Sequence, residues 1–389
     1  MHVESILPEL LRGVIHKKRI ESLCSIVKGV ICHKTLKLSE LGRNLAGKKE
    51  RTGIRIVCRV LANVFYQKHS STIYSCIIKR VVGENKSPDI LVDWSAIPNS
   101  KRSTKEEEYQ VLRASYAAAG RSVTLYEEVH PRSKLNNRSV HKNFLKNLNG
   151  LLPEACKPCI ITDAGFKNPW FKAVLDLGWN YIGRVRGDVH FDDGGGFKPT
   201  TSLHAKASSK ARHLGEFILA KGNALKTNFY LYTHKIKGRK KLNRNGTYAK
   251  DKDSLTHARG YREPLVIVSS LQKQASTIIK KYQSRMTIEE SLRDTKSRTY
   301  GFNLNDNKTQ KAQRYIVWLF IAALAALVAW IVGYLAEKAK LHYDFQANSN
   351  KDTRVLSFVF LGTRIIKKEI NFLYDCCTII QEVFGSAQI

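Results

Sequence analysis

Acidic residues are scarce in this sequence relative to basic ones. The 389 residues include 33 Asp and Glu against 65 Lys and Arg, which gives a formal net charge of +32. Such an excess of one sign repels itself in isolation and calls for a polyanionic partner, with nucleic acid as the leading candidate. Residues 1–86 and 186–262 each contain 17 basic and 6 acidic residues. Two separated basic blocks suggest two separate DNA contacts.

The sequence also lacks the marks of an exported protein. Its N-terminal segment has no long apolar core, so it does not resemble a secretory signal. Eight cysteines show neither the density nor the regular spacing of a disulfide scaffold, and we interpret them as reduced, cytoplasmic thiols. Cys156 and Cys159 have the spacing of half a zinc site, but no second pair follows at a finger-like distance. We therefore expect a cytoplasmic protein without structural zinc.

One long apolar run is present at residues 316–335, which are 20 residues without a charge. That length suits a transmembrane helix. However, the run contains five alanines, and no second span or flanking basic cluster accompanies it, which suits a helix buried inside a large domain. We predict a core helix and no membrane, and a membrane-anchored basic protein is the alternative.

The residue pattern predicts a mixed α/β chain of two or three domains, with 43% hydrophobic residues to form a core. The N-terminal part, residues 1–80, is typical of short amphipathic helices. After a linker at 83–90, the sequence predicts strands at 90–92, 109–117, 122–129, 158–162, 179–185 and 265–269. It predicts helices at 141–148, 168–177, 278–296, 309–340 and 365–385.

Three acids are placed by these predicted elements. Asp93 and Asp163 follow the strands at 90–92 and 158–162, and Glu289 lies on the helix predicted at 278–296. On a continuous helix, the side chains at positions 282, 285, 289 and 296 fall within an arc of about 60°. The stripe consists of Tyr282, Arg285, Glu289 and Lys296, so it places the Glu289 carboxylate among cations. The alternative for the stripe is an ion-paired surface face, and for each aspartate a turn or cap.

Carboxylate oxygens are the ligands that Mg²⁺ and Mn²⁺ prefer. Two such ions roughly 3.5–4 Å apart activate an attacking oxygen and stabilise a leaving one during phosphodiester displacement. Asp93, Asp163 and Glu289 are therefore candidate metal ligands, with a polyanion as the substrate.

Four segments carry a family resemblance: VDWS at 92–95, TDAGFKNPWF at 162–171, GRVR at 183–186 and YQSRMTIEESLRDTK at 282–296. Together they resemble the bacterial cut-and-paste insertion-sequence transposases of the insertion-sequence-four family, which have a DDE site and a Tyr-Arg-Glu-Lys signature. The resemblance implies two Mg²⁺ ions, replaceable by Mn²⁺, on the catalytic residues Asp93, Asp163 and Glu289. It further implies DNA contacts by Tyr282, Arg285, Lys296, Arg293, Arg184 and Arg186.

The resemblance also implies an organisation of the chain. An RNase H-like catalytic core would occupy residues 86–186 and 264–340 and would be interrupted by a β-rich basic insertion at 187–263. A basic helical domain at 1–85 would bind the terminal inverted repeats, and a helical region would follow at 341–389. The implied partners are double-stranded terminal-repeat and target DNA, with a homodimer in the synaptic complex, in the bacterial cytoplasm near the nucleoid.

The implied reaction is strand cleavage, hairpin formation and strand transfer. Hairpin formation in this family uses a Trp after a Glu-Pro pair, whereas this chain has Leu265 after Glu263 and Pro264. Leucine does not stack on a flipped base as Trp does, and Tyr261 is the available substitute. The alternatives are a regulatory or inactive copy that binds DNA without cutting it, and a nuclease that cuts without joining.

Overall fold

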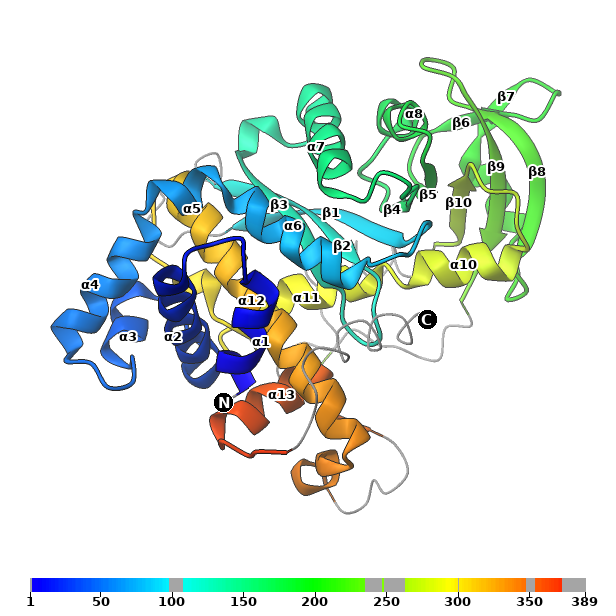
Figure 1. The fold of residues 1–389 in the computed structure, drawn as a ribbon. Helices are drawn as coiled ribbons and strands as arrows, with labels where there is room; N and C mark the ends of the chain where they lie inside the picture. The colour runs from blue at the N-terminus through cyan, green and yellow to red at the C-terminus, as the bar shows by residue number, and fades with distance from the viewer. Residues whose placement is uncertain are drawn as a thin grey trace. The chain divides into compact units, whose positions relative to one another are not determined.

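The computed structural model describes residues 2–97, 108–234, 247, 263–299, 301–347 and 354–372. The chain forms two compact units (Figure 1). The first unit consists of Met1–Pro158 and Met286–Ile389, and the second consists of Cys159–Arg285. The fold is mixed α/β, and each unit is described separately below.

The N-terminal part of the first unit is helical, as the sequence predicts. Its apolar residues recur at helical spacing and are buried, as in the second helix, where Leu23, Val27 and Val30 are all fully buried. The helices are α1 (His2–Leu11), α2 (Lys17–His33), α3 (Leu38–Arg43), α4 (Glu50–Leu61), α5 (Val64–Lys68) and α6 (Ser70–Val81).

Three antiparallel strands of the first unit form the predicted meander in the order β3-β2-β1. They are β1 (Asp89–Ile97), β2 (Tyr109–Tyr116) and β3 (Val123–Pro131). The prediction that a strand ends at Asp93 is wrong. β2 continues to pair with β1 as far as Ile97, so Asp93 lies in mid-strand opposite Arg113.

The remaining helices of the first unit are α7 (Arg138–Leu151), α11 (Met286–Lys296), α12 (Ala312–Lys338) and α13 (Phe358–Lys367), with short 3₁₀ helices η2 (Arg132–Lys134), η4 (Leu304–Asp306) and η5 (Leu341–Phe345). The predicted helix at 365–385 is wrong in its described part, because α13 begins earlier and ends at Lys367. Residues 373–389 of that prediction lie outside the described residues.

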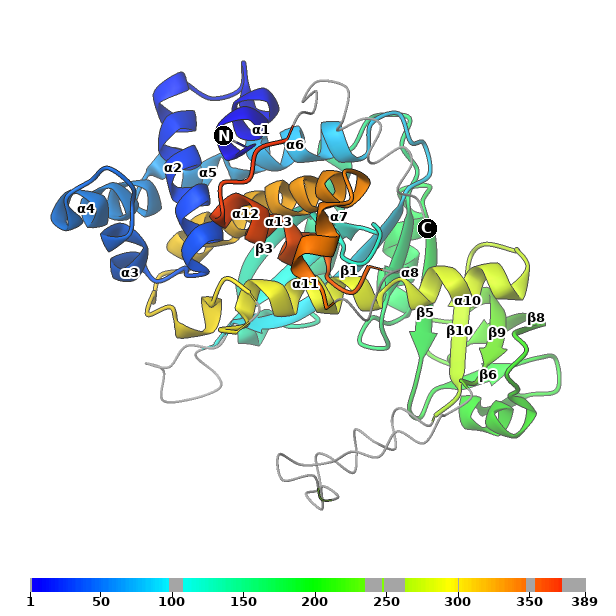
Figure 2. The same cartoon turned by 90° about the horizontal axis from the view of Figure 1, so that it is seen from below.

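Helix α12 is the core helix of the first unit. By length and composition alone it is apolar enough to span a membrane, but 89% of its most apolar window is buried within the protein. It contacts α1, α2, α6, α13 and β3, and Figures 1 and 2 show it running beside α2 and α13. Burial on all sides explains why the helix has no polar face.

Two glycines allow α12 and α13 to pack closely. A Cβ added at Gly333 would lie 1.9 Å from the carbonyl oxygen of Phe358, and one added at Gly362 would lie 1.9 Å from that of Ala329. Both distances are far below any van der Waals contact, so only glycine fits at the helix crossing.

The second unit contains seven strands in the order β4-β5-β10-β9-β8-β6-β7. Strands β4 and β5 are parallel, and the other described pairs are antiparallel. The elements are β4 (Cys159–Thr162), α8 (Asn168–Leu175), β5 (Asn180–Val185), β6 (His190–Asp192), β7 (Phe197–Pro199), η3 (Thr200–Lys206), β8 (Arg212–Leu219), β9 (Leu225–Tyr232), β10 (Leu265–Ser269) and α10 (Ala275–Gln283). The described part of the predicted insertion is β-rich, and it joins the sheet where β9 pairs with β10.

The predicted helix at 278–296 is two helices. α10 ends at Gln283 and α11 begins at Met286. The Ser284 hydroxyl donates to the Lys281 carbonyl over 2.7 Å, and the Arg285 amide donates to the Tyr282 carbonyl in a 3₁₀-type bond of 3.1 Å. These bonds tighten the backbone and end the regular helix. The break therefore removes the continuous stripe predicted from the sequence.

The close packing of α12 on α13 predicts a large cost for one added methyl group. Gly362→Ala should lower the free energy of unfolding by about 2 kcal/mol or more, because neither backbone can move away without opening the core. Gly150→Ala on α7 is the matched control, since a Cβ there meets nothing within 4 Å. The control should be neutral or stabilising by about 0.5–1 kcal/mol. Urea unfolding of both variants measures the difference, and equal stability would contradict the assigned helix crossing.

Candidate active site

The three predicted acids belong to both units. Asp93 is half-buried in β1, and Glu289 is exposed in the first turn of α11, both in the first unit. Asp163 is half-buried directly after β4, in the second unit. Among the described residues, no three His, Cys, Asp or Glu side chains form a group that would hold a metal ion.

In the first unit, Lys296 of α11 lies beside Asp93 of β1. The Lys296 ammonium donates to the Ser95 hydroxyl over 2.5 Å. Burial, and then the charge of Arg113, lower the pKa of Lys296 to about 8, while Asp93 and Glu108 oppose that shift. Sequence spacing paired Lys296 with Glu289, and the structure adds Asp93 and Ser95 as its neighbours.

A buried ion pair lies next to Asp93 on the same three strands. Arg113 is directly opposite Asp93 on one side and Glu127 on the other, so the three side chains share one face of the meander. The Arg113 Nε donates to Glu127 over 2.5 Å, and their side chains are only 2% and 1% exposed. The Tyr74 hydroxyl donates a second hydrogen bond to Glu127 over 3.1 Å.

Arg113 also connects this strand face to α11. Its guanidinium lies 3.5 Å from the Ser291 hydroxyl and 3.4 Å from the Thr295 hydroxyl. The sequence signal for this residue is the single charge inside the apolar strand YQVLRASY, which the sequence analysis did not assign. A buried charge in a strand requires a partner, and Glu127 is that partner.

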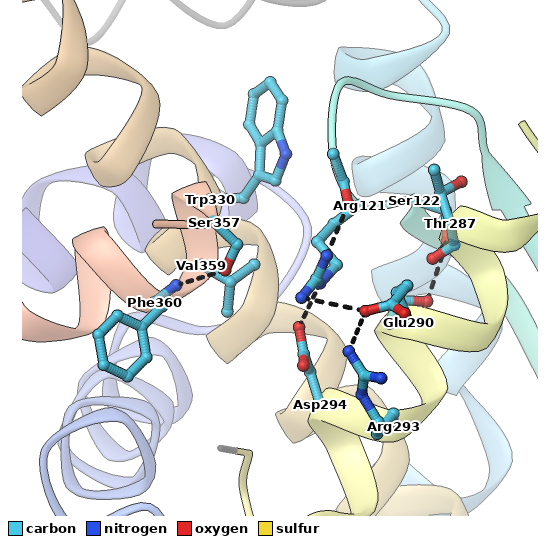
Figure 3. Close-up of polar contacts among 12 residues, drawn as sticks. Arg121, Ser122, Thr287, Glu290, Arg293, Asp294, Trp330, Ser357, Val359 and Phe360 are labelled. Atoms are coloured by element: carbon cyan, nitrogen blue, oxygen red, sulfur yellow. Dashed lines mark hydrogen bonds and ion pairs between the residues drawn. The ribbon is translucent and has the colours of Figure 1, made fainter. Parts of the chain in front are cut away.

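The turn between β2 and β3 fixes the opposite side of α11. Arg121 donates from Nε to Asp294 over 2.7 Å and contacts Glu290 at 3.3 Å, and Figure 3 shows it reaching between these two acids. The next residue, Ser122, donates to the Thr287 carbonyl over 3.3 Å. These contacts hold the helix on the side lying roughly 100–160° from Glu289. Glu289 itself is exposed in the first turn of a helix that these contacts hold on another side.

Arg293 lies on the Glu289 side of α11. Its side chain is 59% exposed and forms an ion pair with Glu290, one turn back. That pair is within the helix and solvent-exposed, so it contributes little stability.

In the second unit, Asp163 lies near a group of cations. Its Oδ1 accepts a hydrogen bond of 2.8 Å from the Gly165 amide, which orients the carboxylate in a turn after β4. Burial raises the pKa of Tyr282, Arg285 and Arg184 lower it, and Asp163 raises it. Asp163, Arg184, Tyr282 and Arg285 are therefore electrostatic neighbours, and the Arg285 guanidinium lies 5.9 Å from the centre of the Tyr282 ring.

Glu263 is a further acid in this group that the sequence analysis quoted without a role. It contacts Arg186 at 2.5 Å and Arg184 at 3.6 Å. Two buried nitrogens of Arg184, Nε and Nη2, have no hydrogen-bond partner in the described part of the chain. A buried donor without an acceptor is costly in the protein alone. The negative charge of Glu263 therefore stabilises Arg184, although its Nε and Nη2 form no hydrogen bond within the described part of the chain.

Leu265, the residue that departs from the expected Trp, begins β10 opposite Tyr232 and is 8% exposed. It is a packing residue of the strand. The suggested substitute, Tyr261, lies outside the described residues.

Comparison with known proteins gives one family. A family model described as "Transposase DDE domain" matches residues 84–326, more than half of the chain. Among solved structures, the chain is similar to piggyBac transposase in a synaptic complex with hairpin DNA, with 11% identity and a TM-score of 0.47. That similarity covers 99% of this chain and 77% of the piggyBac chain. No curated protein sequence matches.

The buried pair predicts a strongly coupled stability effect. Arg113→Met should lower the free energy of unfolding by about 3–5 kcal/mol, because it leaves Glu127 buried without a counter-charge. The double variant Arg113→Met with Glu127→Leu should lose less than the sum of the two single variants. Urea unfolding of all three variants closes the double-mutant cycle. Additive losses would contradict the coupling.

The position of Lys296 predicts a pH dependence of stability. Its folded pKa of about 8 is below the ordinary lysine value of about 10.4, so between these values the unfolded chain binds more protons than the folded one. Stability contributed by Lys296 therefore rises as pH increases through this window. Unfolding in EDTA at pH 7 and pH 10 should show wild type gaining relative to Lys296→Gln. A difference between the two proteins that is independent of pH would contradict this environment.

Proposed function

The chain belongs to the family of transposases with a DDE domain, and from this membership we propose that it catalyses cut-and-paste transposition of a bacterial insertion sequence. In this proposal it binds the terminal inverted repeats of its element, cleaves the DNA strands, forms a hairpin and joins the freed end to target DNA. The observation that carries the proposal is the family match over residues 84–326, a range that includes every candidate site residue.

The donor set suits the metal that such a family implies. Asp93, Asp163 and Glu289 offer only carboxylate oxygens, the ligands that Mg²⁺ and Mn²⁺ prefer. The two aspartates are oriented by backbone amides, since Asp93 accepts from the Trp94 amide and Asp163 from the Gly165 amide, both over 2.8 Å. We propose that these three residues hold two Mg²⁺ ions. Bound Mg²⁺ would activate water and stabilise the leaving oxygen during phosphodiester displacement.

The other candidate residues would position DNA. The Arg184 guanidinium, which lies 3.6 Å from Glu263 and is an electrostatic neighbour of Tyr282, would attract a phosphate by its charge. Tyr282, Arg285 and Arg186 lie in the same unit and would add contacts beside Asp163. Lys296 and Arg293 lie on α11 with Glu289 and would contact the DNA backbone next to that acid. Such contacts orient the scissile phosphate for in-line attack, which is where proximity contributes most to the rate.

Several finer features belong to the same proposal. We propose that the catalytic core is RNase H-like, that two copies pair the element's ends in a synaptic complex, and that the protein works in the cytoplasm at the nucleoid. The predicted division at 1–85, 86–186, 187–263, 264–340 and 341–389 is retained as the functional organisation. Leu265 is buried in β10 and has no aromatic ring. Base stacking during hairpin formation would therefore come from an aromatic side chain elsewhere in the chain.

Cleavage of an end duplex tests the proposal. Purified protein incubated with labelled terminal-repeat DNA should nick it in Mg²⁺ and not in EDTA. Glu289→Gln should lower the cleavage rate by about 10³-fold or more, because several kcal/mol of transition-state stabilisation depend on the metal. Glu154→Gln, an exposed acid in the same unit, is the matched control and should cut at the wild-type rate.

This cleavage assay has three possible outcomes, and each leads to a different conclusion about the proposed function. Metal-dependent nicking that Glu289→Gln abolishes supports the proposal, and denaturing gels then report whether hairpins form. Specific binding without cutting by the wild type would replace the proposal with a regulatory copy. Cutting that is equal in wild type and Glu289→Gln would remove Glu289 from the active site.

A further inference from the structure

A basic groove lies in the first unit, where the N-terminal helices meet the start of α12. It encloses about 560 Å³ between residues 37–39 and residues 306–314. Four of its lining side chains are cationic and one is acidic, namely Lys37, Lys308, Lys311 and Arg314 against Asp306. None of these residues was assigned a role from the sequence or from the family match.

The cations of the groove are only partly neutralised. Asp306 is engaged by Lys37 at 3.2 Å and by Arg298 at 3.8 Å. No ion pair holds Lys308 or Lys311 within the described parts of the chain, and both side chains are exposed. Among the described residues, the half-buried Arg314 donates to the Cys58 sulfur at 3.9 Å and forms no ion pair. Its positive charge is therefore available to an anion from outside.

The groove wall is rigid. Asn307 is 2% exposed, and its side chain donates to the Leu36 carbonyl over 2.5 Å and accepts from the Thr309 amide over 2.8 Å. Thr309 is held in turn by the Trp318 indole, 3.2 Å from its hydroxyl, and by the Tyr315 hydroxyl, 2.7 Å from its carbonyl. A wall fixed by buried side chains holds the backbone that carries Lys308 and Lys311 in one arrangement before any ligand binds, which lowers the entropy cost of binding.

We propose that this groove binds consecutive phosphates of a DNA backbone beside the N-terminal helices. The inference rests on the proposed function, since it takes DNA as the polyanion. Phosphate oxygens match the lysine and arginine donors, and such contacts position a duplex without reading its sequence. The groove therefore contributes affinity for any duplex and no sequence preference.

Binding to a random-sequence duplex of about 40 base pairs tests the groove by itself, because no cleavage is needed. Lys308→Gln with Lys311→Gln should weaken binding at least roughly tenfold and lower the salt dependence of log K by about 2. The matched control is Lys142→Gln with Lys146→Gln, which removes the same charge from exposed positions of α7. The control should keep the wild-type salt slope.

Equal losses in the two double variants would overturn the groove and leave only the general charge of the protein. Failure of the wild type to bind any duplex would instead overturn the proposed function. Inorganic phosphate should displace the duplex only at concentrations far above that of the duplex, because one ion replaces only one of the consecutive phosphates. Displacement of the duplex by inorganic phosphate at equal concentration would assign the groove to a free anion and overturn its assignment to DNA. Thermal unfolding of each variant checks that the fold is retained.

Discussion

The first unit depends on one buried ion pair, between Arg113 and Glu127. Two charges in a protein interior are tolerated only when they pair closely and satisfy further hydrogen bonds. Here the pair takes hydrogen bonds from Tyr74 of α6 and reaches two hydroxyls of α11. The same arginine lies opposite Asp93 in the sheet. One buried charge therefore ties the sheet, an N-terminal helix and the helix carrying Glu289 to a single arrangement.

This constraint explains why α11 can present polar residues without being mobile. Behind the helix, Arg113 and Arg121 hold Thr295, Asp294 and Glu290. Glu289 is exposed in the first turn of this helix. In the second unit, Glu263 balances the charges of Arg184 and Arg186 in a comparable way. Each unit thus positions its cations with an acid that takes no part in the proposed catalysis.

Most elements could be predicted from the sequence, because their apolar residues follow a clear period. The β1–β3 meander, β4 and β10 were found in this way, and the apolar run of α12 was correctly interpreted as a core helix. The crossing of α12 with α13 was not foreseen, since it depends on Gly333 and Gly362 meeting across 29 residues of sequence. The local pattern of apolar residues does not predict a contact between two glycines so far apart in the sequence.

The residues of the candidate site stay predictions, and the structure changes their expected geometry. The sequence placed the stripe on one helix, whereas Ser284 and Arg285 form a break. Asp93 was placed at a strand end because the apolar run stops there, whereas backbone pairing with β2 extends the strand to Ile97. Arg113 was missed because its role depends on Glu127 and α11, which are distant in sequence. The helix break, the end of β1 and the role of Arg113 depend on backbone hydrogen bonds and a buried ion pair, which hydrophobic periodicity does not predict.

Strand joining is the reaction that separates a transposase from a nuclease. A labelled duplex ending in the element's terminal repeat is incubated with a supercoiled target plasmid, Mg²⁺ and either wild type or Asp163→Asn. The account predicts covalent products in which the 3′ end of the repeat is joined to the plasmid, present with wild type and absent with the variant. Cleavage of the duplex without any joined product, across a range of target concentrations, would contradict transposition and leave a nuclease.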